Sequence, residues 1–191
     1  MELLFGIFSA FGLSASAGLN AYIPLFTIAI IAHFTNWLKL SPPYDALANP
    51  WIIILLGILV IIEFLADKVP AFNHFNDVVQ TFVRPIAGAI AFAAAANILT
   101  DINPIIPLAC GLFIAGGVHT AKAVAVRPAV TATTAGAGTV PVSIAEDILA
   151  AITSFLAIVL PVIIACMMVL MTSVLIWWLW RRSNKDRTQT A

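Results

Sequence analysis

The sequence predicts an all-α, polytopic helical membrane protein with about five to six spans, some of them broken or re-entrant, and with an inverted internal repeat. Three observations predict this class: the composition, the length of the apolar stretches, and two motifs that occur twice. Hydrophobic residues make up 62% of the 191 positions and charged residues only 9%, against about 25% charged residues in soluble domains. A soluble fold could not cover its surface with so few polar residues. We therefore expect a multi-pass protein of the bacterial cytoplasmic (inner) membrane, in contact with membrane lipids.

Five apolar stretches are long enough, or nearly long enough, to cross a hydrocarbon core that takes about 20 helical residues. They cover residues 3–33, 51–69, 83–99, 104–134 and 148–180. Glu2 stands where a signal peptide would carry a basic residue, and the apolar pattern continues to His33, so the first stretch is expected to be a retained span. Residues 70–82 are less apolar and predict an interfacial or re-entrant piece.

The first and fourth stretches are too long and too rich in small residues to be plain helices. The first contains several glycine and serine residues, then Asn20 and Pro24. The fourth contains Gly116 and Gly117, followed by Pro128 and the sequence TATTAGAGT. Small residues permit either close helix packing or an unwound segment, and two interruptions that each precede a proline favour unwinding.

Two motifs occur once in each half of the chain and in the same order. GIFSAFG, residues 6–12, matches GLFIAGG, residues 111–117, at every second position. EFLADKVP, residues 63–70, shares FLA and the final proline with SFLAIVLP, residues 154–161. Together these matches favour an internal duplication within a single transmembrane domain. The first repeat would cover about 1–100 and the second about 101–180, followed by a cytoplasmic tail, 181–191.

The distribution of basic residues predicts the topology. RRSNKDR, residues 181–187, is the strongest basic cluster, and such clusters mark the cytoplasmic side. Counting back through five spans puts the loop around Lys39 inside and the N-terminus outside. Three crossings then separate the two copies of the first motif, so they would enter the membrane from opposite sides, as in inverted-repeat transporters.

Three potential cations, His119, Lys122 and Arg127, lie in the fourth stretch. An ionised side chain at mid-membrane costs about 2.5–3.5 kcal/mol, so such groups persist where they face a polar cavity or each other. On a helix, Lys122 lies about 60° from His119 and Arg127 about 80° to its other side, so the three share one broad face. Snorkelling to an interface explains Arg127 equally well, whereas Lys122 favours a functional or paired role.

The carboxylates Glu63 and Asp67 lie four residues apart near the end of the second stretch, so they share one helix face. Asp67 and Lys68 are also explained by a position at the membrane interface. Glu63 directly follows an apolar run, and we expect it to carry a proton or to be the counter-ion of Lys122 or Arg127. An ion pair that only locks the second span to the fourth explains Glu63 equally well.

Three other charged groups have structural explanations. Arg84 precedes Pro85, where a helix start is expected, and it either anchors the interface or reaches the cavity. Glu146 and Asp147 follow Ser143 in the sequence SIAED, which matches a capping box at the start of the fifth span. We therefore expect these two carboxylates to stabilise a helix end rather than to bind a solute.

The sequence gives little indication of enzymatic chemistry. The three histidines lie on different segments without the spacing of metal ligands, and Cys110 and Cys166 have the surroundings of small core residues. An intramembrane hydrolase would need a base near Ser14 or Ser16, and the sequence shows none beside them. We therefore expect a protein that is not an enzyme and that uses no cofactor or metal. The formal net charge of zero gives no indication of a nucleic-acid partner.

Several stretches together resemble a known family: SASAGLNAYIPL; EFLADKVP with NHFND; VRPIAGAIAFA; and HTAKA, RP, TTAG and VSIAED in that order. They are similar to an uncharacterised bacterial integral-membrane family, domain of unknown function 4126. The resemblance covers roughly Phe5 to Ile164. It implies a membrane location and carries with it no established substrate and no catalytic residue.

These observations predict a small membrane transporter or channel for an anionic solute with proton coupling, with its site where the two broken spans meet. The alternatives are a lipid-phosphate flippase or lipid-binding protein, in which the cations meet a lipid headgroup, and a non-transporting scaffold subunit. A chain with so few spans is expected to form a homo-oligomer, most simply a dimer. The residues expected to contact the solute or ion are Ser14, Ser16, Asn20, Glu63, Asp67, Arg84, His119, Thr120, Lys122 and Arg127.

Overall fold

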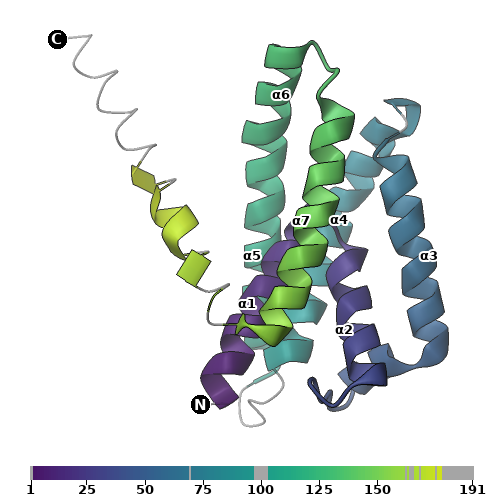
Figure 1. Ribbon diagram of the computed structural model, residues 1–191, viewed down its shortest axis with the longest axis vertical. Helices are drawn as coiled ribbons and strands as arrows, with labels where there is room; N and C mark the ends of the chain where they lie inside the picture. Colours follow the sequence, from purple (N-terminus) through teal and green to yellow (C-terminus); the bar gives the residue numbers. More distant parts are fainter. Residues whose placement is uncertain are drawn as a thin grey trace.

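The computed structural model is a bundle in which every regular element of the described residues is a helix (Figure 1). It describes residues 2–68, 70–96, 103–161, 163, 166–167, 169–174 and 176–177, and of residues 2, 3 and 70–77 the backbone alone. The prediction of an all-helical fold is confirmed for this part of the chain. The elements are α1 (Glu2–Leu19), α2 (Tyr22–Phe34), η1 (Tyr44–Ala48), α3 (Pro50–Ala66), α4 (Pro70–Ala95), α5 (Ile105–Ala121), η3 (Lys122–Val126), α6 (Arg127–Thr134) and α7 (Thr139–Val159).

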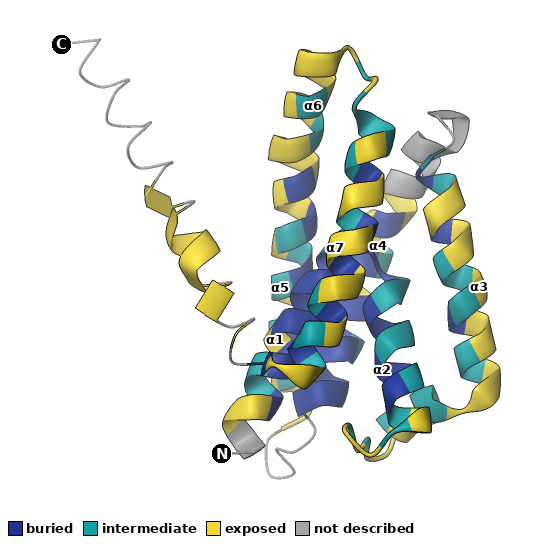
Figure 2. Ribbon diagram, viewed as in Figure 1, coloured by how far each residue is buried: buried dark blue, intermediate teal, exposed yellow. Residues whose placement is uncertain are grey.

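Three described helical stretches are long and apolar enough to cross a membrane: Val78–Ala95, Ile105–Thr134 and Thr139–Val159. α1, α2 and α3 are apolar but shorter. Large apolar side chains point outward, such as Ile61 on α3 and Phe113 on α5, which are 59% and 75% exposed. The buried residues are largely alanine, serine and charged residues. Figure 2 shows where the buried residues lie along the helices. An exterior of this kind suits contact with hydrocarbon better than contact with water.

The first apolar stretch folds as a hairpin of two short helices instead of one span. α1 ends at Leu19, the chain reverses, and α2 leads back. Phe5 at the start of α1 lines the same surface pocket as Trp37 after α2, so both open ends of the hairpin lie at one end of the bundle (Figure 1). The prediction that the N-terminus and the Lys39 loop lie on opposite sides is therefore wrong, because a hairpin returns to the side where it started. The basic cluster 181–187, which predicted a cytoplasmic C-terminus, lies outside the described residues.

α4 is a continuous helix that includes residues 70–82, so these residues form no separate re-entrant piece. Pro85 lies inside this helix, and Arg84 is therefore not at a helix start as the sequence predicted. A proline removes one backbone hydrogen bond from a helix interior. Here its ring packs beside Gly116 of α5, so the contact between α4 and α5 accommodates it.

The fourth apolar stretch stays helical, and the predicted unwinding within it does not occur. α5 passes directly into η3, a π-helical turn that begins at Lys122, and η3 passes into α6. The whole stretch Ile105–Thr134 has 30 residues and extends about 45 Å as a helix. The turn that follows contains Ala135 and Gly136 with positive φ angles of 49° and 89°. π-Helical turns are rare and frequently mark functional sites, which draws attention to Lys122.

α7 begins and ends earlier than the sequence predicted for the fifth stretch. It starts at Thr139, so Ser143, Glu146 and Asp147 lie inside the helix, and its first residue has no side-chain cap. The capping-box prediction is therefore wrong, because the turn after α6 lets the helix begin before SIAED. The helix ends at Val159, which interrupts the apolar stretch there. Inside a helix, the two carboxylates need partners from other elements.

Small residues let α1, α4 and α5 pack closely in the centre of the bundle. A side chain at Gly88 would collide with Ala115, and one at Gly111 would collide with the backbone of Gly88. A side chain at Gly18 would come within 2.6 Å of the carbonyl oxygen of Ala115. These contacts are typical of helix pairs that associate through glycine and alanine.

The helix directions do not support the predicted inverted repeat. α1 and α5, which carry the first duplicated motif, run parallel, because Ser14 contacts Gly111 and, one turn further along both helices, Gly18 approaches Ala115. α3 and α7, which carry the second motif, run antiparallel, because the end of α3 meets the first third of α7. A single symmetry operation would relate both pairs in the same way. The two motif matches therefore do not correspond to two mirrored halves in the described residues.

Candidate functional site

The tip of the α1–α2 hairpin lies among charged side chains from other helices. The backbone N–H of Ala21 donates to the carboxylate of Glu63, with distances of 3.1 Å to Oε2 and 3.3 Å to Oε1. The carbonyl of Leu19 accepts from Nζ of Lys122 at 3.4 Å. A helix carries partial positive charge at its N-terminus and partial negative charge at its C-terminus. Each helix end at the tip therefore faces a side chain of opposite charge.

We call the polar side chains around this point the tip cluster. Its members come from the hairpin, α3 and its C-terminal turn, α4, α5, η3 and α7. They are Asn20, Glu63, Asp67, Lys68, Arg84, His119, Lys122, Glu146 and Asp147.

Asn20 holds the reversal of the chain in place and is 0% exposed. Its Oδ1 accepts from the backbone N–H groups of Tyr22 and Ile23, at 3.1 and 3.0 Å. Its Nδ2 donates to Oδ1 of Asp147 on α7 at 2.9 Å. One amide side chain thus caps the first turn of α2 and also ties the hairpin to α7.

Arg84 of α4 lies at the centre of the tip cluster and is 1% exposed. Its Nη2 donates to Oε1 of Glu63 at 3.0 Å and lies 3.7 Å from Oδ2 of Asp67. The ion pair of Glu63 is therefore with Arg84, whereas the sequence predicted a cation of the fourth stretch. α4 supplies the partner because it continues as a helix through Pro85, and Arg84 on it contacts Glu63 at the hairpin tip.

Two further ion pairs connect α7 to the tip cluster. Nζ of Lys122 lies 2.7 Å from Oε2 of Glu146. Nζ of Lys68, two residues after the end of α3, lies 3.2 Å from Oδ2 of Asp147. α7 thus contributes both carboxylates of SIAED to the interior of the bundle.

His119 links α4 and α5 through both ring nitrogens. Nδ1 lies 3.4 Å from Nη1 of Arg84, and Nε2 lies 3.3 Å from Oγ1 of Thr81. A guanidinium group can only donate, so Nδ1 accepts and Nε2 carries the ring hydrogen. This geometry fits a neutral imidazole, because a proton on Nδ1 would remove the bond to Arg84 and leave two cations side by side.

A polar cavity of about 240 Å³ lies beside the tip cluster, between α6 and α7. Its charged lining residues are Asp67, Arg127 and Glu146, and three of its other lining residues carry hydroxyl groups: Thr131, Thr139 and Ser143. Ser143 donates to Oδ2 of Asp67 at 3.2 Å. Liquid water takes about 30 Å³ per molecule, so the cavity has room for several waters or a small solute. Because Asp67 and Glu146 belong to both the cavity and the tip cluster, a ligand here would act directly on the buried ion pairs.

The structure brings together six of the predicted site residues in the tip cluster, places Arg127 at the polar cavity, and puts three hydroxyl groups elsewhere. Ser14 and Ser16 are 0% exposed, and each donates at 2.8 Å to a backbone carbonyl, in α5 and α7 respectively. Thr120 is exposed and donates to the carbonyl of Gly116 in its own helix at 2.7 Å. Ser14 and Ser16 thus bond one helix to another, and Thr120 bonds only within its own helix. None of the three lines the polar cavity.

Sequence reasoning missed Lys68, Glu146 and Asp147 as members of the site. A signal was present on α7, where the buried residues recur every three or four positions: Ser143, Asp147, Ala150, Ser154 and Ala157. This spacing defines one face of a helix. A polar stripe on one helix face inside an apolar stretch would have indicated a buried helix rather than a helix start.

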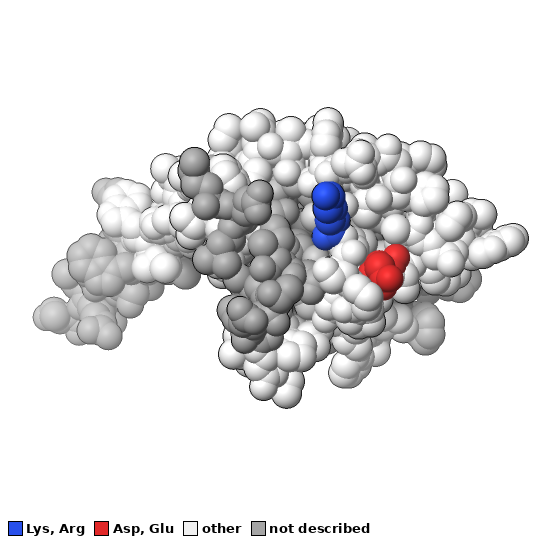
Figure 3. All heavy atoms as spheres, turned by 90° about the horizontal axis from the view of Figure 1, so that it is seen from below, with Lys and Arg blue, Asp and Glu red and all other residues white. Residues whose placement is uncertain are grey.

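Most charged side chains of the described residues lie inside the bundle rather than on its surface. The face shown in Figure 3 carries a small basic patch and a small acidic patch on an otherwise uncharged described surface. No group of three or more His, Cys, Asp or Glu in the described part of the chain is placed to hold a metal ion. Cys110 is half-buried and Cys166 is exposed, both as free thiols.

The amino-acid sequence matches the family described as Domain of unknown function (DUF4126) over residues 7–182. Because the match covers most of the chain, the protein belongs to this family, and the predicted resemblance is confirmed. No curated protein and no solved structure matches the chain. The family description names no activity, so the function has to be argued from the site itself.

Proposed function

We propose that this DUF4126 protein is a small multi-pass membrane transporter or channel that carries an anionic solute together with a proton. The observation that carries the proposal is a polar cavity beside buried, paired charges at the tip of a hairpin of two short helices. Short helices whose ends meet inside a protein and face ionic groups recur in transporter binding sites. Ionisable groups within a membrane are costly, so a function is the default explanation for them.

A membrane location is supported by the distribution of side chains on the outer helices. Ile58, Ile61 and Ile62 of α3 are between 50% and 59% exposed, and Ile148 and Ile152 of α7 are 55% and 52% exposed. Patches of this kind would aggregate in water and are stable in a bilayer. In a bacterial cell the protein would lie in the cytoplasmic membrane, and we expect a homodimer as its assembly.

The charges around the cavity favour movement of an anion together with a proton. The tip cluster and the cavity hold equal numbers of carboxylates and of Lys or Arg side chains, namely Glu63, Asp67, Glu146 and Asp147 against Lys68, Arg84, Lys122 and Arg127. An anion that entered alone would leave an uncompensated buried charge, at a cost of several kcal/mol. A proton taken up by Asp67 or Glu146 would remove this cost.

The ion pair between Lys122 and Glu146 is the best candidate for the coupling step. Arg127 brings a positive charge to the cavity, and Glu146 lines the same cavity while it pairs with Lys122. An anion in the cavity would compete with Glu146 for Lys122, and protonation of Glu146 would favour that exchange. Lys122 also binds the carbonyl of Leu19, so the exchange would reach the hairpin tip.

The test is the uptake of small anions by proteoliposomes that contain a pH-sensitive dye, with phosphate and succinate as the first probes. Arg127→Gln and Glu146→Gln should each lower anion uptake and the accompanying acidification at least tenfold. Lys39→Gln and Asp45→Asn are matched controls, because both residues are exposed in the connection between α2 and α3. Uptake in the folded site variants that equals uptake in the two controls would refute the proposal.

A non-transporting scaffold is the second candidate, favoured by the short ion pair between Lys122 and Glu146. Replacing a buried ion pair by apolar residues of similar volume is often neutral or stabilising. The double variant Lys122→Met with Glu146→Leu should therefore fold and assemble, whether the protein is a transporter or a scaffold. Loss of uptake in this variant supports transport, and full uptake would leave the pair with a structural role only.

A further inference from the structure

The ion pair between Lys122 and Glu146 borders two spaces of opposite polarity. Glu146 lines the polar cavity, and both residues line a groove of about 660 Å³. The groove lies between the bundle and the described part of the C-terminal segment, residues 166–167, 169–174 and 176–177. Apart from the ion pair and Thr172 its lining is apolar, with Val118 and Val126 on the bundle and Leu170, Val174 and Trp177 on the C-terminal segment.

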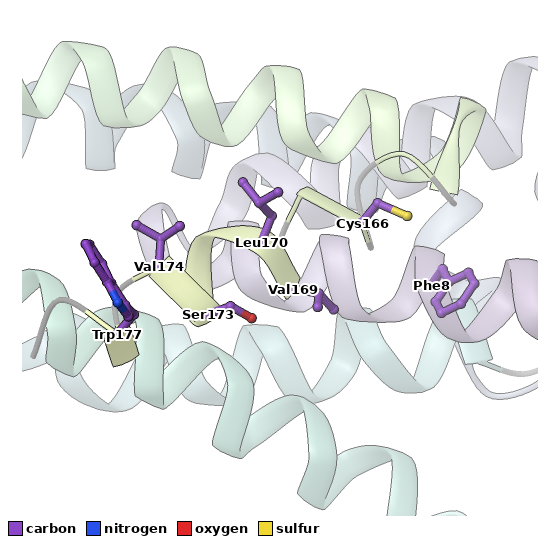
Figure 4. Close-up of a pocket in the computed structure, with 7 residues that line it drawn as sticks. All are labelled: Phe8, Cys166, Val169, Leu170, Ser173, Val174 and Trp177. Atoms are coloured by element: carbon purple, nitrogen blue, oxygen red, sulfur yellow. The ribbon is translucent and has the colours of Figure 1, made fainter. Parts of the chain in front are cut away.

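This groove continues along α1 into a second apolar groove of about 640 Å³. The two grooves share Leu170, Val174 and Trp177. Figure 4 shows Trp177 and Phe8 at opposite ends of the second groove. Leu19 of the first groove and Phe8 of the second are separated by three turns of α1, or about 16 Å. The apolar space is therefore elongated, with its charged end at Lys122.

We propose that the site takes a single-chain amphiphile with an anionic headgroup, held with the headgroup in the polar cavity and the hydrocarbon chain in the two grooves. This inference rests on the proposed transport function and narrows its solute to one chemical class. A polar cavity alone would suit a soluble anion, and an apolar groove alone would suit any lipid. The two spaces meet at one ion pair, and that arrangement suits a molecule with both parts.

Other occupants fit the arrangement less well. A helix from a partner protein or from a second copy of this chain would fill the grooves and leave the polar cavity without a ligand. Lys122 is 4% exposed, so a headgroup can reach it only through the cavity or the groove. The anionic group itself can be a carboxylate, as in a fatty acid, or a phosphate, as in a lysophospholipid.

Trp177 lines both grooves and can report on the chain directly. The test uses a variant that keeps Trp177 and has the other four of the five tryptophans replaced by phenylalanine, in phosphatidylcholine nanodiscs. Brominated chains quench tryptophan fluorescence on contact, and the probes are brominated fatty acid, brominated lysophosphatidic acid and brominated lysophosphatidylcholine. The reference variant keeps only Trp51, which is 78% exposed at the start of α3.

We expect saturable quenching of Trp177 by the two anionic probes, at a mole fraction at least tenfold below that needed to quench Trp51. The zwitterionic probe should quench both tryptophans alike. Ala121→Phe should abolish the saturable quenching, because Ala121 lines the groove without contributing to the ion pair. Ala123→Phe is the matched control, since Ala123 is exposed and lines neither groove.

Anion uptake separates this inference from the proposed function. Equal, unsaturable quenching of Trp177 and Trp51 would overturn the amphiphile site, even where uptake of phosphate depends on Arg127. Equal quenching by anionic and zwitterionic probes would overturn the anionic headgroup. Saturable quenching that Ala121→Phe abolishes, combined with phosphate uptake that Arg127→Gln leaves unchanged, would support the amphiphile site and refute transport of soluble anions through the polar cavity. The ratio of the responses to fatty acid and lysophosphatidic acid then distinguishes a carboxylate ligand from a phosphate ligand.

Discussion

The chain breaks its helix at Asn20 and keeps it helical at Lys122, although both positions lie in apolar stretches rich in small residues. At Asn20, the backbone groups of the two short helices bind partners outside the helix, among them the carboxylate of Glu63. At Lys122, the backbone remains helical through a π-helical turn, and the side chain reaches out to Glu146 and to the carbonyl of Leu19. The broken hairpin thus faces an unbroken helix that carries charge.

This difference shows what a helix break inside an apolar bundle requires. Free N–H and C=O groups are costly where water is excluded, so each needs a substitute partner. At the hairpin tip these partners are Asn20 and other members of the tip cluster. Loss of the cluster should therefore destabilise the α1–α2 hairpin more than it destabilises α5 and α6, and the following variants test this comparison.

The largest effect is expected for Arg84→Met. It leaves the carboxylate of Glu63 buried without its cation, and removing one partner of a buried ion pair typically costs about 3–5 kcal/mol. The measurement is the free energy of unfolding in mixed micelles, with hydrogen exchange to locate the change. Lys39→Met is the control and should cost less than about 0.5 kcal/mol. If protection from hydrogen exchange fell equally in the hairpin, α5 and α6, the hairpin would not depend on the tip cluster more than the other helices do.

Gly88→Val should have the next largest effect, because its side chain would collide with Ala115 in the contact between α4 and α5. Overpacking of this kind typically costs about 1–3 kcal/mol. Gly117→Val is a matched control, since nothing lies within 4 Å of a Cβ atom at that position. Equal unfolding free energies for the two variants would show that the unbroken side of the bundle does not depend on close packing.

Asn20→Ala should cost about 1–2 kcal/mol, because the cap of α2 and the bond to Asp147 are lost together. Faster amide exchange is expected at Tyr22 and Ile23. Asn49→Ala removes the cap of α3, where Asn49 accepts from the N–H of Trp51, and makes a suitable comparison. Its cost should stay near 0.5–1 kcal/mol, about the value of a cap alone, without altered exchange in the hairpin. Identical costs for the two variants would argue that Asn20 acts only as a cap.

The smallest effect is expected for Thr120→Val on the unbroken helix. Thr120 is exposed and bonds within its own helix, so the unfolding free energy should change by less than about 0.5 kcal/mol. Anion uptake should stay within twofold of the unchanged protein. A tenfold loss of uptake would show that Thr120 contacts the solute, as the sequence predicted.

Much of the site was predictable because its members are conspicuous in an apolar chain. Glu63, Arg84 and Lys122 are charged residues within or beside apolar stretches, and Asn20 stands among small residues ahead of a proline. Glu146 and Asp147 were misjudged because SIAED fits a helix start as well as a helix interior. The turn at residues 135–138 ends α6 and lets α7 start before that motif.

The pairing of charges was not predictable from spacing along the chain. Glu63 pairs with Arg84, 21 residues away, and Asn20 bonds to Asp147, 127 residues away. The two motif matches likewise suggested mirrored halves, whereas α1 and α5 run in the same direction. Similar short motifs fix neither the direction of a helix nor its neighbours.

Hydropathy and residue type by themselves determined that this chain is helical, apolar outside, and provided with ionisable groups inside. These properties follow from interactions within a few residues and from transfer between water and an apolar phase, which a sequence displays directly. The tertiary structure alone decided that the first stretch turns back on itself, that the fourth does not, and which cation meets which carboxylate. Such choices depend on distances across the bundle, because ion pairs and backbone partners act through space rather than along the chain.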